Sequence, residues 1–121
     1  MAGKQILGRA FIRIDGQTIA SLPGSAKMSP GGRERTAVLG DFGYLGYSEK
    51  PIHGEIECEI AVAADTDIGA LNATVNASIT FEADTGQVWI MRSAAMASPV
   101  SVAAGDGKAS VKFIGAEIQQ V

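Results

Sequence analysis

The stretch IECEIAV, residues 56–62, alternates apolar and polar side chains, and it decides the class of fold. Alternation with a period of two is typical of a β-strand with one buried and one exposed face. The apolar row predicts a strand on a hydrophobic core and consists of Ile56, Cys58, Ile60 and Val62. The opposite row is acidic and consists of Glu55, Glu57 and Glu59. The strand therefore raises the question of what an acidic face is for.

Similar alternating runs and turn signals occur on both sides of this strand. Asp15-Gly16 predicts a hairpin turn between RAFIRI and QTIA, and ADTG predicts one between TVNASITFE and QVWIMR. A final turn at 105–107 precedes KASVKFI. The exception is DTDIGALN, residues 65–72, which predicts a short helix capped by Asp65 or Thr66. Seven or eight strands thus predict an all-β protein, a small antiparallel β-sandwich or barrel with one short α-helix and a long extended loop or hairpin.

Length and composition place further limits on the protein. With 121 residues, we expect a single domain spanning 1–121, and 46% hydrophobic residues argue against disorder. The net charge of −3 argues against tight phosphate binding. The only cysteine, Cys58, has no intramolecular disulfide partner, and we expect it to be buried and inert. The longest apolar run, 60–64, is too short to span a bilayer, and the first 16 residues lack a signal-peptide core, which predicts a soluble, non-secreted protein.

A glycine-rich segment, GDFGYLGYSEKP at 40–51, carries large apolar side chains in what we expect to be a loop. These side chains are Phe42, Tyr44, Leu45 and Tyr47. One interpretation is that they cap an end of the sandwich. We favour the other, that they contact another subunit, because aromatic side chains supply much of the energy of interfaces.

Catalytic and metal sites find little support in the sequence. The three glutamates are close enough for a paired-carboxylate mechanism or a metal site, but a solvated strand face explains them more simply. His53 lies on the same face, and one histidine with carboxylates is a weak metal signal. Nucleophile and phosphate-loop motifs are missing from the sequence. We therefore expect no enzyme, no catalytic residues, no metal and no cofactor.

Several long stretches together resemble a known family. They are MAGKQILGRAFIRIDG, LPGSAKMSPGGRERTAVLGDFGYLGYSEKP, DTDIGALN, ITFEADTGQVWIMRSA and GDGKASVKFIG. In their order and spacing they are similar to the tail tube proteins of contractile-tailed phages of the Mu-like type, along nearly the full chain. The resemblance implies a virion protein, assembled in the host cytoplasm, whose hexameric rings stack into a hollow tube through which DNA passes without specific binding. It also implies tail sheath, baseplate and tail terminator proteins as partners.

The resemblance suggests roles for both groups of candidate residues. It implies that one sheet of each subunit joins its neighbours in an inner barrel, and that an extended loop or hairpin, here 28–51, reaches the next ring. Glu55, Glu57 and Glu59 could then line a lumen that repels DNA phosphates, although the same row could face sheath or solvent. Two alternative functions remain: a tube subunit of a phage-tail-like injection or secretion machine, and a small β-sandwich ligand-binding module that uses His53 and the glutamates.

Overall fold

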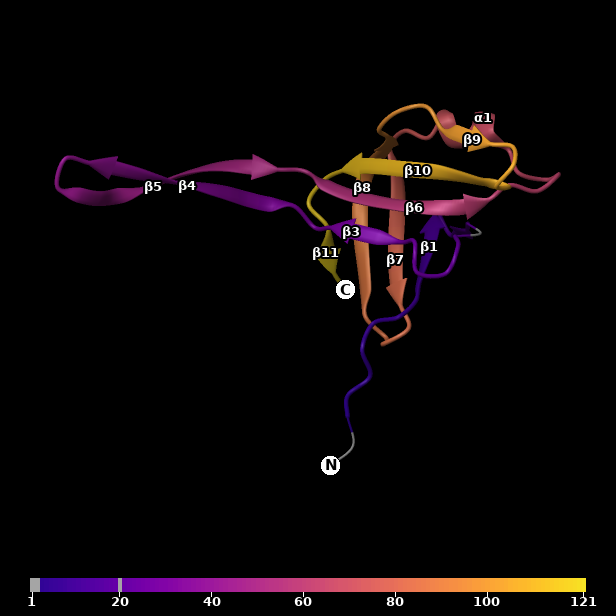
Figure 1. The fold of residues 1–121 in the computed structure, drawn as a ribbon, viewed down its shortest axis with the longest axis horizontal. Helices are drawn as coiled ribbons and strands as arrows, with labels where there is room; N and C mark the ends of the chain where they lie inside the picture. Colours follow the sequence, from indigo (N-terminus) through magenta and orange to yellow (C-terminus); the bar gives the residue numbers. More distant parts are fainter. Residues whose placement is uncertain (1–2, 20) are drawn as a thin grey trace.

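The computed structural model describes residues 3–19 and 21–121. Within these ranges the chain forms eleven strands and one short helix, α1 (Ile68–Asn72) (Figure 1). The strands are β1 (Ala10–Ile14), β2 (Gln17–Thr18), β3 (Lys27–Ser29), β4 (Gly32–Gly40), β5 (Gly43–Ile52), β6 (Gly54–Ala61), β7 (Ala77–Ala83), β8 (Val88–Met96), β9 (Ser101–Ala103), β10 (Lys108–Gly115) and β11 (Gln119–Gln120). Their pairings are antiparallel, which confirms the predicted all-β class. The described part of the chain has no helix long and apolar enough to cross a membrane.

The body of the molecule is one sheet folded over a core. The strand order is β2-β1-β7-β8-β10-β6-β3, with β11 paired to β8 and β9 paired to β10. In Figure 1, β7 and β8 run down the body while β6 and β10 run across it. The two groups join where Phe113 and Ile114 of β10 pair with Met96 and Ala95 of β8. This crossing of two layers encloses the hydrophobic core between them.

The core takes one face of each main strand, as the alternating patterns predict. Ile56, Cys58 and Ile60 of β6 are buried beside Val111 and Phe113 of β10. The other layer contributes Ile12, Ile79, Phe81 and Met91. Val62 lies beyond the end of β6 and is half-buried, so it only flanks the cluster.

The structure corrects two details of the predicted elements. The helix begins at Ile68 and is capped by Asp67, whose carboxylate accepts a hydrogen bond from the Ala70 amide at 3.0 Å. The predicted cap at Asp65 or Thr66 is wrong, because the Thr66 hydroxyl instead accepts from the Ala63 amide in the preceding turn.

The second correction concerns the start of β7. The apolar alternation of TVNASITFE extends to Val75 and predicts it on the core face, but Val75 is 69% exposed. Asn76 has a φ of 52°, a left-handed conformation that interrupts the alternation before β7 begins at Ala77. The strand predicted over QTIA is observed as Gln17–Thr18, and Ala20 lies outside the described residues.

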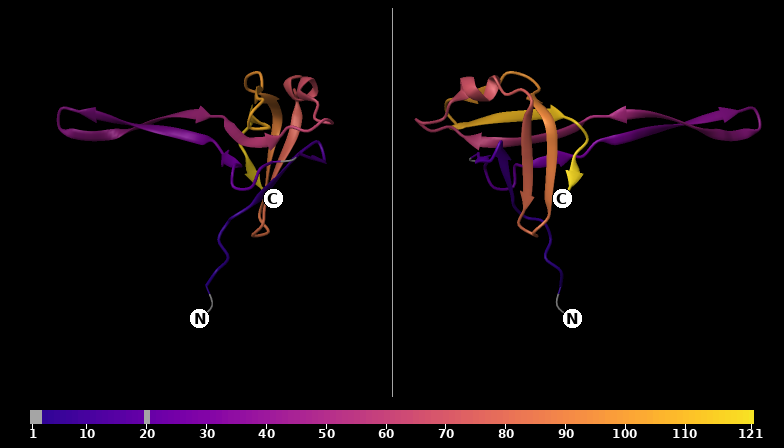
Figure 2. Two further views of the ribbon diagram at one scale, coloured as in Figure 1. Left: turned by 45° about the vertical axis from the view of Figure 1, so that its right-hand side comes forward. Right: turned by 180° about the vertical axis from the view of Figure 1, so that it is seen from behind.

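The largest departure from the sequence-based expectation is the segment 40–51, which is mostly strand rather than loop. β4 and β5 form a two-stranded sheet of their own, and only Asp41 and Phe42 lie between them. The ribbon projects far from the body and is called the arm below (Figures 1 and 2). Gly43, with a φ of 119°, allows the tight turn at the tip. The expectation of an extended loop or hairpin is thus met by a hairpin.

Candidate assembly surfaces

The arm brings together the four apolar residues singled out in the sequence. Phe42 sits at the tip and is fully exposed, while Tyr44, Leu45 and Tyr47 are 65%, 74% and 57% exposed. None of the four caps the sandwich, because the ribbon carries them away from it. Leu39, which is 70% exposed, belongs to the same surface and was missed by the sequence analysis. Its pairing with Tyr44 could not be anticipated from a segment expected to be a loop.

Both faces of the arm carry apolar side chains. Directly opposed residues of an antiparallel pair share a face, so Leu39 lies beside Tyr44, and Ala37 beside Tyr47. The guanidinium of Arg35 lies 5.9 Å from the centroid of the Tyr47 ring on that face. A bulge between Val38 and Leu39 leaves Leu45 without a partner and places it against Gly40 on the other face. Both faces therefore present apolar groups to solvent.

Five charged residues of the arm pair with one another near its root. Arg33 and Arg35 both contact Glu49, at 3.2 and 3.1 Å, and Lys50 contacts Glu34 at 3.4 Å. These pairs are exposed, and each contributes at most roughly 1 kcal/mol. The ion pairs lie near the root, and the most exposed apolar side chains of the arm lie towards its tip.

The glutamate row lies on the polar face of β6, as expected, but it is not isolated. Lysines from the flanking strands share this face: Lys27 of β3 lies opposite Glu57, while Lys112 and Lys108 of β10 contact Glu55 and Glu59 at 3.5 and 3.1 Å. This set of six residues is called the β6 polar face. Its three glutamates and three lysines balance in formal charge. The lysines of β10 were visible as an alternating row, but only the strand register places them beside the glutamates.

The ion pairs hold the side chains of this face in their charged forms. A hydrogen bond from His53, at 2.9 Å, lowers the pKa of Glu55, and the positive charge of Lys112 acts in the same direction. A hydrogen bond to Glu59 and the charge of that carboxylate raise the pKa of Lys108. Both pKa shifts favour the charged forms, the carboxylate of Glu55 and the ammonium of Lys108, that these ion pairs require.

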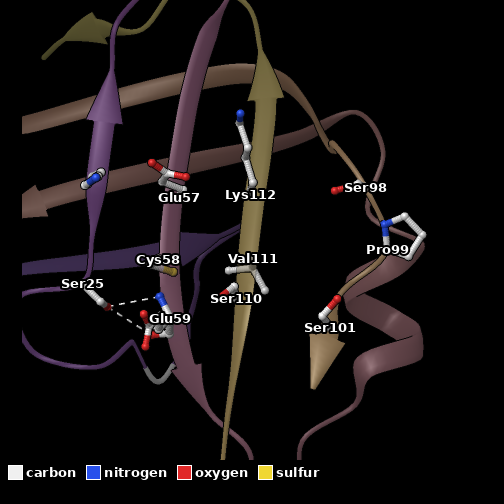
Figure 3. A pocket seen from close by; sticks show the side chains of 11 residues that line it. Ser25, Glu57, Cys58, Glu59, Ser98, Pro99, Ser101, Ser110, Val111 and Lys112 are labelled. Carbon is white, nitrogen blue, oxygen red and sulfur yellow. Dashed lines mark hydrogen bonds between the residues drawn. The ribbon is translucent and has the colours of Figure 1, made fainter. Parts of the chain in front are cut away.

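The middle of the β6 polar face is hollowed into a pocket of about 370 Å³ (Figure 3). Hydroxyl groups and charged groups line it, with Ser101 and Ser110 on one side and Ser25 on the other. The Ser25 hydroxyl bonds to the backbone of Glu59, accepting from its amide at 3.2 Å. The surface is polar and shallow, and Cys58 lies beneath it with a thiol pKa raised by burial to about 12.

The described residues contain no cluster of side chains that could bind a metal ion. His53 contacts Glu55, but no group of three or more potential ligands occurs among the described residues. A single exposed histidine hydrogen-bonded to one carboxylate is less than the set of ligands that a specific metal site brings.

The fold and these surfaces define a class: a small all-β protein with a projecting hairpin that exposes apolar side chains. The family model described as "Phage tail tube protein" matches residues 3–120. The chain therefore belongs to the phage tail tube protein family, as the resemblance implied. Proteins of this family are virion components.

Two relatives show the similarity at the level of sequence. The Mu-like prophage FluMu tail tube protein of Haemophilus influenzae is 36% identical over 117 residues, which cover 97% of each chain. The tail tube protein of Escherichia phage Mu is 35% identical over 94 residues, which cover 78% of each chain. The Mu-like type is thereby confirmed.

Solved structures share the fold at much lower identity. The cap that terminates the tube of the anti-feeding prophage has a TM-score of 0.72 at 11% identity, covering 100% of this chain and 94% of the cap chain. A chain of the sheath-tube complex of an extracellular contractile injection system has a TM-score of 0.65 at 13% identity, covering 98% and 91%. At these identities the likeness shows the fold alone.

Proposed function

We propose that the protein is a structural subunit whose hexameric rings stack into the inner tube of a contractile phage tail, giving a channel for DNA ejection. The arm is the observation that carries this proposal. Isolated two-stranded hairpins are at best marginally stable in water, and this one exposes apolar side chains on both faces. A second subunit that covers Phe42, Tyr44, Leu45 and Tyr47 would stabilise the arm and join the two copies.

The contact made by the arm is heterologous, because the arm of one copy meets a different surface of the next. Heterologous contacts close into rings or continue as stacks. The body supplies a second means of joining: β3 ends the sheet order and β9 pairs only with β10 in the described chain. Such free edges invite pairing with a neighbour. We infer that the layer containing β6 continues from subunit to subunit around the tube.

The β6 polar face is our candidate for the lumen surface. A lumen that passes DNA has to avoid holding phosphates. Glu55, Glu57 and Glu59 repel phosphate and also neutralise the neighbouring lysines, so the face presents no net positive charge. The glutamate row thus answers the question raised by the sequence: it keeps a lysine-bearing surface from binding a polyanion.

The remaining parts of the proposal follow from membership of the family. One domain spanning residues 1–121 assembles in the host cytoplasm and meets the tail sheath, baseplate and tail terminator. It does so without catalysis or cofactor. The relatives named as tail tube proteins support the tube itself, and the shared fold of a tube-terminating cap and a sheath-tube complex is in keeping with these partners.

Negative-stain electron microscopy of the purified protein across a concentration series tests the proposal. We expect rings or hollow tubes of uniform width. Phe42→Ser combined with Leu45→Ser removes apolar contact area. This variant is expected to be folded by circular dichroism and to form no rings or tubes in the micrographs. The matched control is Thr36→Ala with Ser48→Ala, an exposed cross-strand pair on the same arm, which should assemble like the wild type. Wild-type tubes formed by the Phe42/Leu45 variant would contradict the role of the arm.

A tube subunit of a phage-tail-like injection machine is the second candidate, favoured by the fold shared with the extracellular injection system. Both candidates predict the same tube, and they differ in what the particle carries. Nuclease-protected DNA in particles that contain this protein supports the phage tail. Intact particles without DNA, which deliver protein instead, support the injection machine.

A further inference from the structure

The body carries an apolar groove of about 340 Å³ between β1, β2 and α1, at the end of β1 that carries Ile14. It is called the β1–α1 groove below. Its apolar walls come from Ile14, Ile19, Ile60 and Leu71. Asp65 and Asp67 line it on the helix side, and its described lining contains no lysine or arginine. The groove is therefore apolar inside and acidic at the rim, and the body leaves it unfilled.

A short segment before β1 has the complementary character. Residues 3–9 form no strand or helix, and Ile6 and Leu7 are 80% and 48% exposed. The segment is held through Asp84: its carboxylate accepts hydrogen bonds from the Gly8 and Arg9 amides at 3.3 and 3.0 Å, and its backbone carbonyl accepts one from the Gln5 side chain at 3.3 Å. This anchor fixes the direction in which the segment leaves the body and leaves the two aliphatic side chains free.

We propose that the segment 3–9 of one copy inserts Ile6 and Leu7 into the β1–α1 groove of a second copy. This inference rests on the proposed function, since it supplies a contact between tube subunits that is distinct from that of the arm. The groove volume lies near the low end of the roughly 300–1,000 Å³ typical of small ligand sites, a size that suits a few aliphatic side chains.

Charge complementarity favours the segment 3–9, rather than the arm, as the occupant of the groove. Residues 3–9 contain Lys4 and Arg9 and no acidic residue, which matches the aspartate rim. The tip of the arm is acidic instead, because Asp41 lies next to Phe42, and the aspartate rim would repel it. The basic residues of the arm, in addition, are already paired with glutamates near its root.

The geometry requires that the two partners be different copies. The segment leaves one end of β1 and the groove lies at the other end, about 17 Å away for five residues at roughly 3.4 Å each. Figures 1 and 2 show the segment pointing away from α1. The resulting contact is heterologous and repeats along the direction of β1, whereas the arm extends along the crossing direction of β6. A stacked ring needs two such directions of contact.

Disulfide trapping tests the contact in assembled protein. Leu7→Cys combined with Ala70→Cys places one thiol on the segment and one on the exposed helix surface beside the groove. Mild oxidation of assemblies is expected to give a ladder of covalent multimers on a non-reducing gel. Each single variant should give no ladder beyond dimers, because Cys58 is buried. Phe42→Cys with Ala70→Cys tests the arm as the rival occupant.

The possible outcomes separate this inference from the proposed function. Tubes without a Leu7/Ala70 ladder, or a ladder from the Phe42/Ala70 pair instead, would overturn the inference and leave the tube intact. A failure to form either assemblies or cross-links would overturn both. A Leu7/Ala70 ladder supports the inference whether the covalent multimers are rings or longer stacks.

A charge-reversal pair gives an independent measurement on the same contact. Lys4→Glu is expected to raise the protein concentration at which assembly begins by about tenfold, because it sets like charge against the rim. Adding Asp65→Lys should restore assembly, since Asp65 is exposed and does not cap α1. Equal effects of Asp65→Lys in the presence and absence of Lys4→Glu would show that the two residues do not meet.

Discussion

Cys58 illustrates, at the residue scale, how position determines chemistry. The alternating pattern placed it on the buried face of β6, and the structure confirms that it is a free, buried thiol. Burial raises its pKa to about 12, since the thiolate would lose its hydration there. A thiol that stays protonated is a poor nucleophile, so this cysteine serves packing.

The raised pKa predicts a loss of stability at high pH. The unfolded chain releases the Cys58 proton near the ordinary value of 9.0, whereas the folded chain holds it to about 12. The free energy of unfolding should therefore fall as pH rises from 9 towards 12. Urea unfolding at pH 8 and pH 10.5 measures this, with Cys58→Ala subtracting all other titrations. The same pH dependence in both proteins would contradict the assignment.

Gly31 shows a second residue-scale constraint, imposed by close approach. Its φ is 81°, and a Cβ there would lie 2.6 Å from the carbonyl oxygen of Ile52 and 2.7 Å from that of His53. We expect Gly31→Ala to destabilise the fold by about 1–3 kcal/mol, because the chain at the root of the arm has to move. The control is Gly46→Ala in β5, where a Cβ meets no atom within 4 Å. Equal urea midpoints for the two variants would refute the prediction.

At the scale of elements, the arm is the part of the fold that makes few buried contacts, since nearly all residues of β4 and β5 are exposed. Both faces of β4 and β5 are open, and cross-strand contacts and exposed ion pairs hold the ribbon. Elements with few buried contacts open locally at little cost in free energy. The arm should therefore be mobile in the free subunit and ordered in the assembly.

Proteolysis measures this difference. Trypsin is expected to cut free subunits after Arg33 or Arg35, within β4, giving an N-terminal fragment that ends at one of these arginines and a C-terminal fragment with the remainder, while Lys108 and Lys112 in the central sheet resist. Tubes should resist cleavage at the arm because a neighbour covers it. Mass spectrometry of timed digests identifies the sites. Cleavage of the arm at the same rate in tubes and in free subunits would exclude its burial in the assembly.

At the scale of the whole molecule, the charge balance of the β6 polar face is expected to control passage of DNA. Replacing Glu55, Glu57 and Glu59 together by Gln leaves three lysines without counter-charges. Tubes of this variant should retain DNA, and the slope of log K against log salt concentration should be roughly −2.7 for each subunit that contacts the DNA, from about −0.9 per neutralised phosphate. Filter retention of labelled DNA by purified tubes measures it.

The matched control reverses the sign of the imbalance. Replacing Lys27, Lys108 and Lys112 together by Gln leaves an acidic face, which should pass DNA normally. Retention by both variants, or by neither, would exclude a lumen position for this face.

Several features follow from the local sequence alone. Alternation over IECEIAV and KASVKFI gives strands with one buried face, because side chains of a strand alternate. Asp15-Gly16 determines a hairpin, and the order of the stretches indicated the tail tube family, which the comparisons confirm. These features depend on neighbours within a few residues or on the order of segments along the chain.

The tertiary structure decided what depends on distant residues. The segment 40–51 became a strand because β4 offered it a partner, and a glycine-rich sequence alone does not reveal that pairing. The lysines beside the glutamates come from β3 and β10, which the register of the sheet brings to β6. The acidic row thus proved to be half of a charge-balanced surface, because electrostatic interactions follow distance in space rather than separation along the chain.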